Sequence, residues 1–215
     1  MKDKFEWDEY KSKWKAAIER GIDLELKGDE NILYLGASSG TTVGHLCERT
    51  KGIIFAVEKA YKMAISLVKL CEKRVNIAPI FSDAHDVEYI RKMINKNSFA
   101  STSANANAPS ENLKSRGNAH DVEYMKEKIG NERIDILFCD IPSGDQVDIL
   151  IKAAEIVDKD CKILFTLKTQ SISQGEPKDV FKKVKKKLGL MFEIIEERNL
   201  EPYHKKHWFF VLKKK

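Results

Sequence analysis

The stretch Asn31-Ile-Leu-Tyr-Leu-Gly-Ala-Ser-Ser-Gly-Thr-Thr42 decides the fold, because it joins a short apolar run to a glycine-containing turn. Residues 31–35 predict a buried strand, and the turn at 36–42 opens the helix that follows. Glycines there let the backbone approach a ligand, while free N–H groups and threonine hydroxyls can bind a polar, anionic group. The turn lacks the pattern GxxxxGK[ST], so a nucleoside triphosphate site is not indicated, and it lacks GxGxxG, which weakens a dinucleotide reading.

Apolar runs and helical periods alternate along the rest of the chain. Further strands are predicted at 53–57, 77–81, 134–139 and 162–167, and helices at 61–73, 147–157 and 180–188. Such alternation predicts a mostly parallel sheet with helices on both faces. The runs 191–195 and 208–212 have only a turn-like segment between them, which predicts a terminal antiparallel hairpin. We therefore expect an α/β fold with seven strands.

The amino-acid composition limits which classes of protein this chain can belong to. The 215 residues are 42% apolar and 33% charged, which predicts one domain over residues 1–215 with a sizeable core. A net charge of +5 permits polyanion binding without showing it. The chain has no apolar run long enough to span a membrane and no secretory signal. Its four cysteines form no CxxC pair, so we expect a reducing cytosol and neither a disulfide framework nor a metal site.

A repeat flanks a segment of biased composition. Residues 95–117 are rich in Asn, Ser and Ala, and predict a flexible insert. DAHDVEYIRKMI (83–94) precedes the insert and NAHDVEYMKEKI (118–129) follows it. The favoured interpretation is a local tandem duplication, and a second functional element is the alternative. Two copies are too few for a solenoid.

Acidic residues lie where three of the predicted strands end. Glu58 closes the second strand, Asp83 the third and Asp140 the fourth. Ligands of open α/β sheets bind at the carboxyl ends of the strands, so these acids and the glycine turn should share one crevice. Several acids without a phosphate-binding lysine suit a cationic adenosine derivative, S-adenosylmethionine. Helix capping is the alternative for each acid taken singly.

Five segments carry a resemblance to a known family. YLGASSGTT (34–42) resembles the S-adenosylmethionine motif of fibrillarin, the RNA 2′-O-methyltransferase of box C/D ribonucleoproteins. EWDEYKSKWKAAI (6–18) resembles EWNPYRSKLAAA, and DILFCDIPSGDQ (135–146) resembles LYADVAQPEQ. LKTQSIS (167–173) resembles IKARSID, and NLEPYHKKHWFFVL (199–212) resembles HLDPFDRDHAMIYAV. The family's N-terminal β domain and its eukaryotic Gly–Arg-rich tail are not seen, so the archaeal form is the closer likeness.

The resemblance implies a methyltransferase fold of Rossmann-like type and a set of site residues. The family's catalytic Lys–Asp–Lys–His set falls on Lys13, Asp140, Lys168 and His207. The implied cofactor contacts are Gly36, Ala37, Ser38, Gly40, Thr41, Thr42, Glu58, Lys59, Asp83, Ala84, Asp140, Ile141, Pro142 and Ser143. Asp83 takes the adenine role because the second copy of the repeat has Asn118 in its place.

The resemblance also implies a function and partners. The implied reaction is 2′-O-methylation of rRNA, with tRNA as a further implied substrate, and S-adenosylmethionine is the implied methyl donor. The implied partners are a box C/D guide RNA, the target RNA, a Nop-domain scaffold protein and a kink-turn-binding protein of ribosomal type. The expected location is cytoplasmic for an archaeal-type chain, or nucleolar in a eukaryote. A protein-glutamine methyltransferase and a catalytically decayed subunit of the same particle are the alternatives.

Several residues are interpreted as structural or are given no functional role. Trp7, Tyr10 and Trp14 are spaced like one helix face and predict packing, and the lysine run 182–187 predicts a solvated helix face. The remaining histidines, His45, His85, His120 and His204, are given no role. Lys168 can act as a base only if its pKa is lowered, and otherwise steers the attacking hydroxyl or stabilises the alkoxide. The sequence leaves open which group takes the proton.

Overall fold

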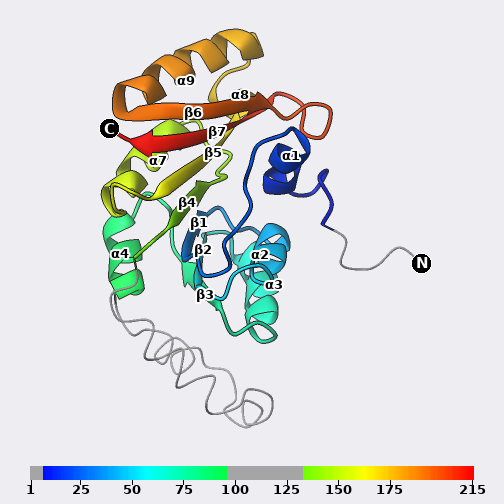
Figure 1. Cartoon of the computed structure of the whole chain (residues 1–215), viewed down its shortest axis with the longest axis vertical. Helices are drawn as coiled ribbons and strands as arrows, with labels where there is room; N and C mark the ends of the chain where they lie inside the picture. Colours follow the sequence, from blue (N-terminus) through cyan, green and yellow to red (C-terminus); the bar gives the residue numbers. More distant parts are fainter. Residues whose placement is uncertain (1–6, 96–132) are drawn as a thin grey trace, which may run out of the picture.

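The structure is a computed structural model that describes residues 7–95 and 133–215. Most of the predicted insert and the second copy of the repeat lie outside the described residues. One seven-stranded sheet runs through the molecule in the order β3-β2-β1-β4-β5-β7-β6 (Figure 1). Its strands are β1 (Ile32–Leu35), β2 (Ile54–Glu58), β3 (Ile77–Phe81), β4 (Ile136–Cys139), β5 (Lys162–Lys168), β6 (Phe192–Asn199) and β7 (His207–Lys214).

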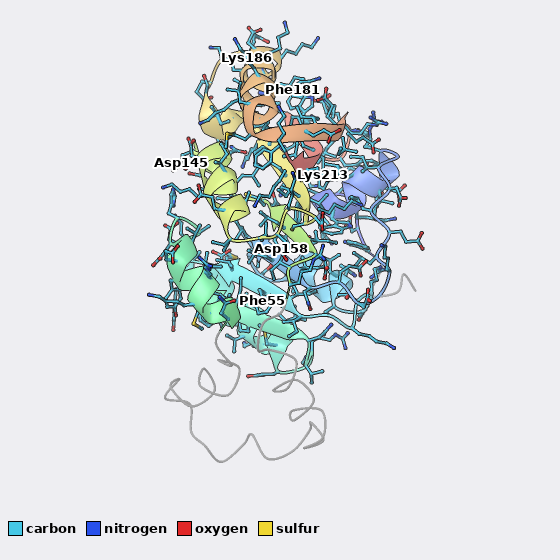
Figure 2. All side chains as sticks on the ribbon, turned by 60° about the vertical axis from the view of Figure 1, so that its left-hand side comes forward. Phe55, Asp145, Asp158, Phe181, Lys186 and Lys213 are labelled. Atoms are coloured by element: carbon cyan, nitrogen blue, oxygen red, sulfur yellow. The ribbon has the colours of Figure 1, made fainter. Side chains whose placement is uncertain are left out.

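Helices cover both faces of the sheet, as predicted. One face carries α1 (Lys13–Glu19), α2 (Thr41–Leu46) and α3 (Tyr61–Cys71). The other carries α4 (Val87–Asn95), α7 (Gln146–Glu155) and α9 (Pro177–Met191), with the short α8 (Thr169–Ile172) after β5. Figure 2 shows Phe181 on α9, where its ring stacks on Trp208 at 5.1 Å between centroids.

Alternation along the strands builds two cores. In β1, Ile32 and Tyr34 pack under α1 to α3, whereas Leu33 packs on the opposite face. β4 repeats the pattern, since Phe138 lies on the first face and Leu137 on the second. These strands are buried on both faces, which is why they read as continuous apolar runs. The carboxyl ends of β1 to β5 all meet at one edge of the sheet because their pairings are parallel.

The hairpin at the end of the chain is longer than predicted. β6 runs to Asn199 and β7 begins at His207, so the turn covers only the residues between them. β7 pairs antiparallel to both β5 and β6. The second half of β6 contains charged residues such as Glu196 and Arg198, so it lacks the apolar run that predicts a strand. β6 is an edge strand, where charged side chains are common.

Two further sequence expectations are corrected. α1 begins at Lys13 with Ser12 as its N-cap, so Trp7 and Tyr10 precede the helix and do not share its face. Trp7 and Trp14 are buried as packing predicts, whereas Tyr10 is 60% exposed. Asp83 does not close β3, because that strand ends at Phe81.

The structure also bears on the cysteines and on membrane insertion. All four cysteines are free thiols. Across residues 7–95 and 133–215, no helix combines the length and the apolar character that crossing a bilayer requires.

Candidate active site

A cavity of about 390 Å³ opens at the carboxyl edge of the sheet, where β1 to β4 end. It gathers most of the predicted cofactor residues: Gly36, Ser38, Glu58, Lys59, Asp83, Ala84, Asp140, Ile141, Pro142 and Ser143. Lys13 reaches it from the start of α1. A larger hollow, of about 660 Å³, is lined by residues such as Trp7, Leu24 and Arg49, and it contains none of the predicted site residues.

The glycine turn is shaped by two close contacts. Gly36 has a φ of +84°, and a Cβ there would lie 2.7 Å from the carbonyl oxygen of Asp140. Only glycine fits so close an approach of two strand ends. The backbone N–H of Ser38 donates to Glu58 Oε2 at 2.8 Å, and that of Ala60 donates to Glu58 Oε1 at 2.6 Å. Glu58 therefore fixes the turn against the end of β2.

A histidine left without a role joins two carboxylates at the rim of the cavity. His85 Nδ1 lies 2.6 Å from Asp83 Oδ1, and its Nε2 lies 2.6 Å from Asp145 Oδ2 (Figure 2 labels Asp145 at the start of α7). Hydrogen bonds to Asp145 and then to Asp83 raise the pKa of His85. The His85 bond in turn lowers the pKa of Asp83, with Lys59 at 3.1 Å contributing less. An imidazolium is the form that donates to both carboxylates.

The pair Lys13 and Asp140 also lines the cavity. Lys13 Nζ donates to Asp140 Oδ2 at 2.9 Å, with the two side chains 25% and 14% exposed. Burial raises the pKa of Asp140, and the Lys13 ammonium opposes that rise, as do His204 and Lys168 more weakly. The carboxylate is thus held beside cations in a poorly solvated position.

The remaining two members of the predicted catalytic set lie next to this pair. Lys168 and His207 are cross-strand partners where β5 ends and β7 begins. The buried Gln146 fixes the end of β5, since its Oε1 accepts from the Lys168 N–H at 3.0 Å and its Nε2 donates to the Lys168 carbonyl at 3.2 Å. Neither Lys168 nor His207 lines the cavity, but the charge of Lys168 acts on Asp140, and the charge of Lys13 acts on His207.

His204, in the β6–β7 turn, and His207, the first residue of β7, both have lowered pKa values. Burial lowers the pKa of His207, and the charges of Lys13 and Lys168 lower it further. Burial and then Lys13 lower the pKa of His204, whose ring centroid lies 5.8 Å from that of His207. His204 was missed by sequence reasoning because it carries no motif, and only the turn brings it near Asp140.

Four predicted cofactor residues do not line the cavity. Ala37 and Thr42 are buried, and Thr41 is exposed. Gly40 is the N-cap of α2 and lies against Leu67 and Leu70. The Thr42 hydroxyl donates to Ser12 Oγ at 3.0 Å and bonds the buried Tyr34 hydroxyl. Their contact with a cofactor stays a prediction.

The lining fits an S-adenosylmethionine-sized cation with hydroxyl groups. Glu58 at the end of β2, Asp83 after β3 and Asp140 after β4 supply acceptor oxygens. Gly36 leaves room for a ligand to approach the backbone. Carboxylates suit ribose hydroxyls, an amino group and a positive sulfur, whereas they would repel phosphates. The capping alternative accounts for part of each acid's bonding, since Glu58 and Asp83 also accept backbone N–H groups, but it does not explain why all three face one cavity.

Comparison with known proteins identifies the family. The family model described as fibrillarin matches residues 2–102 and 119–215, and the gap overlaps the predicted insert. The chain belongs to the fibrillarin family. A curated relative from Archaeoglobus fulgidus, a fibrillarin-like rRNA/tRNA 2′-O-methyltransferase, is 34% identical over 207 residues, which cover 95% of this chain and 81% of the relative.

Solved structures of fibrillarins share the fold. One, of a fibrillarin/Nop5p complex, is 31% identical with a TM-score of 0.73 and covers 97% of this chain and 84% of its own. Another, of Aeropyrum pernix fibrillarin with natively bound S-adenosyl-L-methionine, is 26% identical with a TM-score of 0.70 and covers 96% and 76%. The fold of this fibrillarin-family chain is thus the Rossmann-like fold of S-adenosylmethionine-dependent methyltransferases.

Proposed function

We propose that this fibrillarin-family methyltransferase transfers a methyl group from S-adenosylmethionine to a ribose 2′-hydroxyl of rRNA or tRNA, as the catalytic subunit of a box C/D guide ribonucleoprotein. The observation that carries the proposal is the Lys13–Asp140 ion pair in the lining of the cavity, with Lys168 and His207 close enough to interact electrostatically with members of that pair. The reaction named for the A. fulgidus relative and the cofactor bound by the A. pernix fibrillarin support it.

Positioning accounts for much of the proposed chemistry. When bound, S-adenosylmethionine supplies a methyl group on an electrophilic sulfonium. A ribose hydroxyl is a weak nucleophile, so holding its oxygen in line lowers the barrier. Asp140 can accept a hydrogen bond from the hydroxyl and so orient it, and Lys13 fixes that carboxylate through the 2.9 Å bond. Lys168 places a positive charge near the same point, where it stabilises negative charge forming on the oxygen.

His207 is suited to receive the proton. Its pKa is lowered by burial and by two lysines, so its ring is neutral at pH 7. Nδ1 lies 2.7 Å from the Lys205 carbonyl, and because a carbonyl only accepts, Nδ1 carries the hydrogen. Nε2 is then the free acceptor. A positioned base of this kind contributes about 10²–10⁴-fold to a rate.

Target choice is proposed to lie with partners. The net charge of +5 gives a general electrostatic attraction to RNA. The lysine run 182–187 on α9 is partly neutralised within the protein, since Lys185 Nζ donates to Glu197 Oε1 at 2.7 Å. A guide RNA would select the nucleotide by base pairing, with a Nop-domain scaffold and a kink-turn-binding protein holding it. The solved fibrillarin/Nop5p complex supports the scaffold as partner.

A transfer assay tests the proposal. The full chain, a guide RNA, its target and the two partner proteins are incubated with radiolabelled S-adenosylmethionine. Label is expected at one target ribose, and label appearing only in protein would reject the RNA reading in favour of a protein-glutamine acceptor. Failure to bind the cofactor in calorimetry would instead favour a decayed subunit.

A lysine pair provides the internal control. Lys162 and Lys168 begin and end the same strand. Lys168→Ala is expected to retain cofactor binding and to lower transfer by about 10²-fold or more, because it removes charge that acts on the reacting groups. Lys162→Ala should transfer normally, because Lys162 bonds the carbonyl of Asp23 away from the cavity. Equal activity of the two variants would contradict the assignment of Lys168.

A further inference from the structure

A histidine bridge joins two walls of the 390 Å³ cavity. His85 lies in the loop after β3, and Asp145 lies in the loop between β4 and α7. β2 and β1 separate β3 from β4 in the sheet, and neighbouring strands are about 4.8 Å apart, so the two loops start about 14 Å from each other. They nevertheless meet, because His85 Nε2 lies 2.6 Å from Asp145 Oδ2. Both loops line the cavity, the first through Asp83 and His85 and the second through Ser143. The bridge therefore ties together two walls that the sheet holds apart.

The Asp145 carboxylate serves this bridge and not its own helix. Asp145 is the N-cap of α7, a position where aspartate usually accepts a backbone N–H of the first helical turn. Here its side chain makes no such bond. Oδ1 accepts instead from the Ser143 hydroxyl, and Oδ2 faces the His85 ring. The contact with His85 is therefore not a by-product of helix capping.

The bridge also decides which oxygen of Asp83 is left for a ligand. Asp83 Oδ1 accepts from the backbone N–H of His85 at 3.1 Å and lies 2.6 Å from the ring Nδ1. Two bonds use both lone pairs of one carboxylate oxygen and prevent the carboxylate from rotating. Oδ2 accepts from Lys59 at 3.1 Å, and the Lys59 side chain is 64% exposed. One acceptor position on Oδ2 therefore remains for a group in the cavity.

The charge on His85 sets whether both walls are held. A neutral imidazole carries one N–H and can donate to one carboxylate, whereas the imidazolium donates to two. The charged groups that act on the ring are Asp145 and Asp83, and Lys59 acts through its bond to Asp83. Glu58 lines the same cavity, but its carboxylate already accepts two backbone N–H groups. The two carboxylates raise the pKa of His85. The ring therefore holds both walls when protonated and releases one when neutral.

We infer that His85 is a positioning residue for S-adenosylmethionine: its protonated ring ties the two walls together and holds Asp83 Oδ2 free to accept from the adenine amino group. The inference rests on the cofactor role that the proposed function gives this cavity, and it concerns binding and not the transfer step. His85 acts here through Asp83 and Asp145. Cofactor binding and protonation of His85 then favour each other, and such coupling is reciprocal.

Calorimetry with the full chain and S-adenosylmethionine tests the coupling between about pH 6 and 8.5, where a histidine with a raised pKa loses its proton. His85→Gln keeps a polar side chain but carries no charge at any pH. At the acid end its Kd should exceed that of the wild type by roughly 3- to 10-fold, because charge-assisted hydrogen bonds to two part-exposed carboxylates are lost. The ratio should approach one at the alkaline end, where the wild-type ring is neutral too. Taking the ratio cancels the titration of the cofactor's own amino group.

Three further variants separate positioning from general stability. Asp145→Asn removes one end of the bridge and should resemble His85→Gln. His85→Arg stays charged and can donate to two carboxylates, so it should keep the acid-end affinity of the wild type at every pH. His45→Gln on α2 is the control. The His45 ring stacks on Trp7 at 5.5 Å between centroids and does not line the cavity, so this variant should keep the wild-type profile.

NMR of the His85 ring gives a readout independent of activity. Bound S-adenosylmethionine should raise the pKa of His85, and a tenfold ratio of Kd values corresponds to a rise of about one pH unit. A pKa of His85 that the cofactor leaves unchanged, or a His85→Gln profile equal to that of the wild type, would overturn the positioning role and leave the proposed function standing. A wild-type chain that binds no S-adenosylmethionine at any of these pH values would overturn both.

Discussion

Replacing Gly36 by alanine should damage both stability and catalysis. The residue has a φ of +84°, a conformation that costs an alanine about 1–2 kcal/mol. The added Cβ would also lie 2.7 Å from the Asp140 carbonyl oxygen and 3.1 Å from Ile141 Cγ1. Relieving that overlap requires a backbone shift, which costs about 1–3 kcal/mol more. The expected loss in unfolding free energy is about 2–5 kcal/mol.

Gly21 provides the matched control. Its φ is +87°, nearly the same, but a Cβ there would meet nothing within 4 Å. Gly21→Ala should therefore lose only the conformational term of about 1–2 kcal/mol. In thermal unfolding each kcal/mol corresponds to about 2–4 °C in Tm for a chain of this size. The difference between the two variants isolates the contact with Asp140.

Catalysis separates the two variants further. A shift of the Asp140 backbone moves its carboxylate relative to Lys13, and a displacement near 1 Å costs about 10²-fold in rate. Gly36→Ala should therefore bind S-adenosylmethionine weakly and transfer slowly at a temperature where it is folded, whereas Gly21→Ala should transfer normally. Equal Tm values and equal transfer rates for the two variants would refute the close approach of β1 and β4.

Other expectations concern the core and three histidines. Trp14→Ala removes a fully buried ring that meets Phe138 edge to face at 5.3 Å, and should cost about 3–5 kcal/mol in urea unfolding; a loss below about 1 kcal/mol would contradict that packing. The two carboxylates raise the pKa of His85, so the stability that this bridge adds is present below pH 6.5 and is lost as pH rises through the raised pKa. Because these groups are partly exposed, His85→Gln should lower the free energy of unfolding by at most about 1 kcal/mol. Unfolding measured between pH 5 and 8 checks this, and a pH profile that the substitution leaves unchanged would count against the bridge. The pKa values of His204 and His207 are lowered, so as pH falls these rings take up protons in the unfolded chain before they do so in the folded one, and stability decreases below about pH 6.5. The double variant His204→Asn/His207→Asn should flatten that decrease. A stability profile as steep as that of the wild type would exclude the burial of these rings.

The parallel part of the sheet was predictable because its strands are buried on both faces. Residues such as Leu33 and Phe138 leave apolar runs that alternate with amphipathic helices, and the glycine turn after β1 follows from local backbone chemistry. The strand-end acids follow from the same topology, since parallel strands bring their carboxyl ends to one edge. The topology of the parallel sheet therefore predicts Glu58 and Asp140 as site residues, whereas only the family resemblance predicts Lys13, Lys168 and His207.

The parts that escaped prediction depend on contacts between distant segments. The carboxylates joined by His85 lie at positions 83 and 145, and no local pattern records that pairing. Gln146 is fully buried because it bonds the end of β5 from the start of α7, although glutamine is usually a surface residue. Tyr10 looked like part of a helix face because its spacing to Trp14 is helical, but Ser12 caps α1 after it.

The antiparallel strand explains how a histidine late in the chain joins this site. A parallel β7 would begin at the opposite edge of the sheet and carry His207 away from the cofactor cavity. Because β7 runs antiparallel to β5, its first residue pairs with the last residue of β5, Lys168, at the edge where the other strands end. The β6–β7 turn then projects over that edge and brings His204 and Tyr203 with it. The reversal of one strand therefore builds the side of the proposed site that we assign to the acceptor, while the parallel strands build the cavity that we assign to the cofactor.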